Sequence, residues 1–139
     1  MDLTGIPAGT KRVTVTVNGV STNGTSAFVI QLGDSGGFET TGYTGGLTTG
    51  TGQVANSTYF HITAGSQASH VWYGGFTLMK ITDTGDSWLY QSNTGGTTMF
   101  NQIGAGTKTL TGELTQIRFT TAGGTNTFDL GSLGIAYEQ

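Results

Sequence analysis

The sequence predicts an all-β protein: an antiparallel, jelly-roll-like β-sandwich of about eight to ten strands without a substantial helix. Apolar residues alternate with threonine in several short stretches, which is the period of a half-buried strand. The chain has 25 glycines, as many tight turns between short strands require. No stretch keeps a helical period over several turns, and no repeat of fixed length indicates a propeller or a solenoid.

The clearest strand pattern lies between residues 11 and 32. Two runs of alternating apolar residues occur there, and they are Val13, Val15 and Val17, then Phe28, Ile30 and Leu32. Alternation places the apolar side chains of each run on one face of a strand. Asn23-Gly24 between the runs has the composition of a turn. We expect this region to form two antiparallel strands that cover one core.

Several shorter elements surround that region. Residues 3–7 form an opening segment before the first long strand, and residues 33–37 form a glycine-rich loop. A short strand is expected over 38–43 and another over 54–63. Between them, residues 44–52 are nearly all threonine and glycine, and they form either a flexible loop or one that neighbouring strands hold in place.

The middle of the chain has the pattern of central strands. Residues 71–82 are apolar without clean alternation, which indicates a strand covered on both faces. Gly74-Gly75 within this strand predicts a bulge or a bend. Turns are expected at 83–86 and 93–96, on either side of a strand that contains Trp88.

The last third of the chain contains one irregular strand region and one regular strand. Apolar residues over 108–121 change their spacing between Leu114 and Ile117, so a bulge or a change of register is expected there. Residues 123–126 form a turn into the final strand. That strand alternates again, at Leu133, Ile135 and Tyr137.

Length and composition exclude several classes of protein. The 139 residues fit one domain, expected over 1–139. Charged residues make up 9% of the chain and the net charge is −3, so we expect no nucleic-acid partner, which would need clustered cations. No apolar run reaches the roughly 18 residues of a membrane span, and we expect no membrane insertion. The chain lacks cysteine, which excludes disulfides and thiolate metal sites.

The low charge of the surface has two interpretations. A surface rich in threonine, serine, glycine and asparagine can be a neutral hydrogen-bonding surface for sugars or identical subunits. It can also be no more than an exterior with few charges.

Residues 33–37, Gly-Asp-Ser-Gly-Gly, are similar to the nucleophile loop of chymotrypsin-type serine proteases. Such an enzyme places its histidine and aspartate before the serine in the chain, whereas His61 and His70 both follow Ser35. The hydrolase order of serine, acid and histidine leaves only Glu39 as the acid, and nothing marks Glu39 as a partner. A glycine-rich turn explains these residues, and no catalytic residue is expected.

Two carboxylate pairs have the residue types that a glycosidase uses: Asp83 with Asp86, and Asp34 with Glu39. The first pair lies in a turn, where aspartate commonly caps its own backbone. The histidines and aspartates do not have the spacing of a metal site. We therefore expect no metal and no cofactor; the alternative is a structural cation between subunits.

Aromatic residues around the 83–86 turn are the candidates for ligand binding. Sugar rings stack on indole and phenol planes, while short polar side chains bind the sugar hydroxyls. The candidate ligand-binding residues are Trp72, Tyr73, Asp83, Asp86, Trp88 and Tyr90. The alternative is that the rings fill the core or a subunit interface, and adjacent Trp72 and Tyr73 point to opposite faces of a strand.

A set of short segments, densest at the two ends of the chain, shows a resemblance to a known family. The segments are residues 3–12, 18–26, 31–33, 40–43, 108–112, 117–118, 128–129 and 135–138. They resemble a domain at the C-terminal end of the tail-fibre proteins of tailed bacteriophages and prophages. Residues 44–107 match only in general character.

The resemblance implies a β-sandwich tip domain that is non-catalytic and forms a homotrimer. It implies binding to a bacterial surface polysaccharide or an outer-membrane receptor, in a virion assembled from protein made in the host cytoplasm. It also implies that Met1 was added to a fragment of a longer fibre protein. The alternatives are a structural trimerisation or virion decoration domain, a depolymerase or esterase, and a secreted lectin-like domain outside phages.

Overall fold

The computed structural model describes residues 1–98 and 101–139, and in that part every regular element is a β-strand. Twelve strands form two antiparallel sheets, which confirms the predicted all-β sandwich class. The strands exceed the predicted eight to ten because β1, β4, β5, β6 and β7 are only two or three residues long. No helix that could span a membrane occurs among the described residues.

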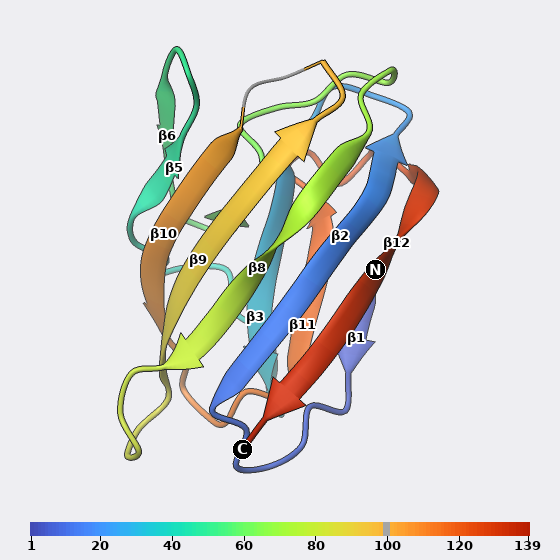
Figure 1. Ribbon diagram of the computed structural model, residues 1–139. Helices are drawn as coiled ribbons and strands as arrows, with labels where there is room; N and C mark the ends of the chain where they lie inside the picture. The colour runs from blue at the N-terminus through green and yellow to red at the C-terminus, as the bar shows by residue number, and fades with distance from the viewer. Residues whose placement is uncertain (99–100) are drawn as a thin grey trace.

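The larger sheet has seven strands in the order β12-β2-β8-β9-β10-β5-β6 and lies in front in Figure 1. Its strands are β12 (Phe128–Glu138), β2 (Arg12–Thr22), β8 (Trp72–Lys80), β9 (Ser87–Gly96), β10 (Gln102–Thr109), β5 (Gly46–Thr48) and β6 (Gln53–Ala55). The alternation in β2 and β12 leaves one face of this sheet apolar and the other polar.

The smaller sheet has five strands and lies behind the first in Figure 1. Its strands are β1 (Asp2–Thr4), β11 (Gln116–Thr121), β3 (Phe28–Asp34), β4 (Gly37–Phe38) and β7 (Phe60–His61). Strand β3 pairs with β11, β4 and β7. Its residues are buried except Gln31, which is half-buried. The apolar faces of the two sheets pack on each other and form one core.

The two strands predicted within residues 11–32 are β2 and β3, and both contribute to one core. They do not pair with one another, because β2 belongs to the larger sheet and β3 to the smaller one. The turn between β2 and β3 is held by the loop that precedes β12. The backbone N–H of Asn23 donates to the carbonyl of Thr127 at 3.1 Å, and the Asn126 side chain fills the space beside Gly24. The Asn-Gly turn therefore carries the chain from one sheet to the other.

Strand β8 is central in its sheet, as predicted, but only one of its faces is buried. Trp72, Phe76 and Leu78 face the core, whereas Tyr73 is exposed. The predicted bulge at Gly74-Gly75 was wrong in position: β8 pairs continuously with β9, and the irregularity lies opposite, in β2. There Gly19 adopts a φ of 66°, the left-handed conformation of a glycine bulge.

Several other boundaries differ from the prediction. Residues 93–96 belong to β9 and are not a turn, and the threonine- and glycine-rich segment 44–52 contributes β5 of a short hairpin with β6. The spacing change within residues 108–121 marks a crossing from β10 in one sheet to β11 in the other. Of the strands predicted at 38–43 and 54–63, only short pieces are present.

Candidate functional site

A groove of about 770 Å³ crosses the outer face of the seven-stranded sheet. Strands β2, β8 and β9, which run side by side in Figure 1, supply most of its lining. Thr16, Gly75 and Asn93 are paired residues in these three strands, and Thr14, Thr77 and Gln91 form the next row. The groove exists because the outward positions of these strands carry small or polar side chains, while the inward positions carry the core.

Two adjacent glycines of β8 line the groove. A Cβ atom at Gly74 would meet the carbonyl oxygen of Asn93, and one at Gly75 would meet the carbonyl oxygen of Val15. Gly74 also has a φ of 126°, a conformation that other residues rarely adopt. Glycine is therefore required here for close strand packing. Gly75 lies in the outward row, so its missing side chain deepens the outer face, whereas Gly74 lies in the inward row.

One aromatic ring lies at an end of the groove. Tyr73 is 48% exposed and follows the buried Trp72 in β8, so that its ring points away from the core. Its paired residues are Asn18 in β2 and Gly95 in β9. The Asn101 amide lies over Gly95, so this amide and the half-exposed Tyr73 ring line the same end of the groove.

Uncharged polar side chains line the groove. None of its lining residues in the described part of the chain carries a charge. The side-chain amides of Gln91, Asn93 and Asn101 are exposed, and each amide offers donors and an acceptor. The threonine hydroxyls of the adjacent strands add further donors and acceptors. The groove can therefore bind a neutral ligand that is rich in hydroxyl groups.

Three of the predicted ligand-binding rings lie in the core, and the prediction of an exposed stacking surface was wrong for them. Trp72, Trp88 and Tyr90 are almost completely buried. The indole N–H of Trp72 donates to the Ser66 hydroxyl at 3.0 Å. The Tyr90 ring stacks on Phe60 with centroids 4.4 Å apart, and burial raises the pKa of its phenol. Of the four predicted rings, Tyr73 alone reaches the groove.

The two predicted aspartates lie at the other end of the sheet from Tyr73. Asp83 and Asp86 belong to the turn between β8 and β9, and seven residues of strand, roughly 23 Å, separate Tyr73 from Lys80. Asp83 pairs with Lys11 at 3.0 Å, and Asp86 with Lys80 at 3.9 Å. The structure does not bring these aspartates and Tyr73 into one site.

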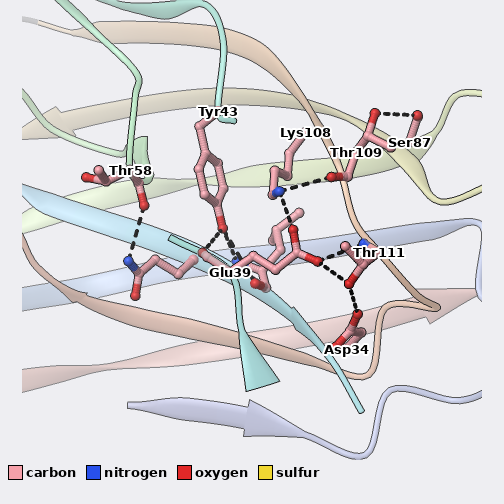
Figure 2. Close-up of polar contacts among 10 residues, drawn as sticks. Asp34, Glu39, Tyr43, Thr58, Ser87, Lys108, Thr109 and Thr111 are labelled. Atoms are coloured by element: carbon pink, nitrogen blue, oxygen red, sulfur yellow. Dashed lines mark hydrogen bonds and ion pairs between the residues drawn. The ribbon is translucent and has the colours of Figure 1, made fainter. Parts of the chain in front are cut away.

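The second carboxylate pair, Asp34 and Glu39, does come together, around Thr111 (Figure 2). The Thr111 hydroxyl lies 2.8 Å from a carboxylate oxygen of each residue. The Thr111 backbone N–H donates to Glu39 at 2.7 Å, and the ammonium of Lys108 forms an ion pair with the other Glu39 oxygen. Lys108 reaches inward from β10, so this cluster joins the two sheets at one end of the sandwich.

The cluster is held by contacts within the protein. Burial alone would raise the pKa of Glu39, but the hydrogen bonds from Lys108 and Thr111 outweigh it, and the pKa is lowered. The Tyr43 hydroxyl accepts from the Leu32 N–H and donates to the Glu39 carbonyl, each at 2.8 Å, and burial raises the pKa of Tyr43 to about 12. These contacts therefore link β10 of the larger sheet to the end of β3 in the smaller sheet.

The serine loop and the histidines have local structural contacts. Asp34 accepts a hydrogen bond from the Gly36 N–H at 2.7 Å and so caps its own turn. His61 lies 3.2 Å from the Asn56 side chain, and His70 packs edge-on against Trp72. Among the described residues no group of three histidine, aspartate or glutamate side chains could hold a metal ion.

Comparisons of the chain with protein-family models, with curated proteins and with solved structures found no match.

Proposed function

We propose that the protein is a non-catalytic receptor-binding domain, the tip of a bacteriophage tail fibre, which attaches the virion to a glycan on the bacterial surface. The observation that carries the glycan assignment is the uncharged groove of the seven-stranded sheet, with Tyr73 exposed at its end. The resemblance of the chain ends to tail-fibre tip domains supports the biological setting. It also supports assembly as a homotrimer and a place in the virion after synthesis in the host cytoplasm.

The chemistry of the groove suits a sugar ring. The C–H face of a sugar packs on the plane of an aromatic side chain, and Tyr73 offers such a plane. Sugar hydroxyls both donate and accept hydrogen bonds, as do the amides of Gln91 and Asn93. The shallow, open shape of the groove leaves room for the rest of a polymer to extend beyond the bound unit.

Replacing Tyr73 by alanine is expected to weaken glycan binding about 5- to 150-fold, because a central aromatic anchor contributes roughly 1–3 kcal/mol. The measurement is a screen of the protein on an array of bacterial surface polysaccharides, followed by titration calorimetry of the best ligand. Tyr73→Phe, which keeps the ring, should retain most of the affinity.

The matched control is Tyr59→Ala, which removes a half-buried tyrosine that packs on His61, away from the groove. It should leave the affinity unchanged. If Tyr73→Ala binds as tightly as the unaltered protein, the groove is not the glycan site. If no bacterial glycan binds at all, the receptor-binding assignment is wrong.

A second candidate function, assembly without a receptor, is favoured by the free edge of β12. This eleven-residue strand pairs only with β2 among the described strands, and a long free edge is a template for pairing with another chain. Leu130 on this strand is 59% exposed. A second copy of the chain, docked edge to edge, would cover both the backbone groups and this side chain.

Leu130→Glu is therefore expected to reduce the mass of the assembly in sedimentation velocity, because the new charge would be buried at the subunit contact. The control is Ile103→Glu, which alters a similarly exposed apolar residue on β10, remote from the β12 edge. An unchanged mass for Leu130→Glu would exclude the β12 edge as the subunit contact.

A further inference from the structure

A second hollow, of about 540 Å³, lies on the outer face of the seven-stranded sheet at the β5-β6 hairpin. Strands β10, β5 and β6 line it, with side chains that are small, apolar or neutral. The lining includes Gly46, Thr48, Gln53, Ala55, Ile103 and Ala105. As in the first groove, no lining residue in the described part of the chain is charged.

The strand register places the two hollows side by side on the outer face of the sheet. We call the combined surface the track. Asn93 and Gln91 of the groove pair directly with Ile103 and Ala105 of the second hollow. Residues directly opposite in an antiparallel pair share a face of the sheet. Ile103 then pairs with Thr48, and Thr48 with Gln53. The track thus crosses from β2 to β6, five strand spacings or roughly 24 Å, which is longer than one sugar ring.

From this geometry we infer that the ligand is a neutral polysaccharide chain that lies lengthwise across the strands, with sugar units in both hollows. The inference rests on the proposed function and names its ligand class. Glycine and alanine along the second hollow let a chain approach the backbone closely. Ile103, 58% exposed, offers an apolar surface to the C–H face of a sugar unit between the two hollows.

The neutrality of the ligand follows from the lining. A carboxylate or phosphate on the sugar would lose part of its hydration in the track without meeting a cation, which is unfavourable. Two cations lie at the margin of the track, at the far end of β2 from Tyr73, and each is already paired with a carboxylate: Lys11 with Asp83, and Arg12 with Glu138. A neutral glycan has no such loss, and its binding should be insensitive to salt.

The test uses size-fractionated oligomers of the neutral polysaccharide that the array identifies, titrated against the unaltered protein and two variants. Affinity should rise about tenfold or more from trisaccharide to hexasaccharide as the second hollow is filled, and should stay the same between low and high salt. Ala105→Glu, which places a charged side chain in the second hollow, should reduce the hexasaccharide to the affinity of the trisaccharide.

Ala122→Glu is the matched control, since Ala122 is exposed in the turn after β11, in the other sheet. It should bind both oligomers normally. Equal affinities for trisaccharide and hexasaccharide, or normal hexasaccharide binding by Ala105→Glu, would overturn the extended track while leaving glycan binding intact. Tight, salt-sensitive binding of acidic oligomers would overturn neutrality. Failure of every glycan to bind would overturn the proposed function itself.

Discussion

Lys108→Met is expected to lower the free energy of unfolding by about 3 kcal/mol at neutral pH, the lower end of the range for breaking a buried ion pair. The Lys108 side chain is 5% exposed and its partner Glu39 is 18% exposed. Removing the ammonium leaves the Glu39 carboxylate largely buried, with Thr111 as its one remaining donor in the described part of the chain. Urea denaturation of both proteins measures the difference.

The pH dependence of this difference identifies its cause. The pKa of Glu39 is lowered from its ordinary value of 4.5 in the folded protein. Its contribution to stability is therefore complete above the unfolded pKa and is lost as the pH falls through the folded pKa. In Lys108→Met the lowering by the ammonium is lost, so the pKa of Glu39 is higher than in the unaltered protein. Lowering the pH below about 4.5 should consequently narrow the gap between the two proteins.

The double variant Lys108→Met, Glu39→Gln is the control for this pair. Glutamine keeps an acceptor for Thr111 but carries no charge, so the double variant should recover part of the stability lost by Lys108→Met. A gap that is independent of pH, or a double variant less stable than Lys108→Met, would show that packing of the lysine chain and not its charge holds the sheets together.

The fold class could be predicted from the sequence because a period of two directly reports burial on one face. Val13, Val15 and Val17 in β2 and the alternating residues of β12 face the core as the pattern predicts. Which strands pair with one another could not be predicted in the same way. Whether the Asn23-Gly24 turn makes a hairpin or a crossing between sheets depends on Asn126, about a hundred residues along the chain.

The candidate site depended on which strand faces are buried and on how the strands are aligned, and the sequence carries a signal for the first of these only. Alternation establishes that Trp72 and Tyr73 face opposite sides, but not which side is the core. In β9 the polar residues indicate which face is exposed, because Gln91 and Asn93 alternate with the apolar Trp88 and Tyr90. The register that places Thr16, Gly75 and Asn93 in one row arises from pairing between distant strands. The groove becomes visible only when these strands are aligned.

The aromatic cluster around Phe28 predicts the largest loss of stability from a single truncation. Phe28 of β3 is fully buried and makes edge-to-face contacts with three rings. They are Trp72 at 6.2 Å, Phe119 at 5.8 Å and Phe128 at 5.4 Å between centroids. Trp72 and Phe128 belong to the larger sheet and Phe119 to the smaller one, so one ring links both layers of the sandwich.

Phe28→Ala is therefore expected to lower the free energy of unfolding by about 4 kcal/mol, from lost burial and from a cavity that rigid strands cannot close. Denaturant unfolding measures it. The matched control is Phe38→Ala in β4, whose half-buried ring lies over Arg118 at 4.2 Å and should cost about 1 kcal/mol. Equal losses for the two variants would mean that Phe28 does not join the sheets. A much larger loss for Phe28→Ala would place the link between the sheets in this cluster, because the two substitutions remove the same atoms and differ only in what the ring contacts.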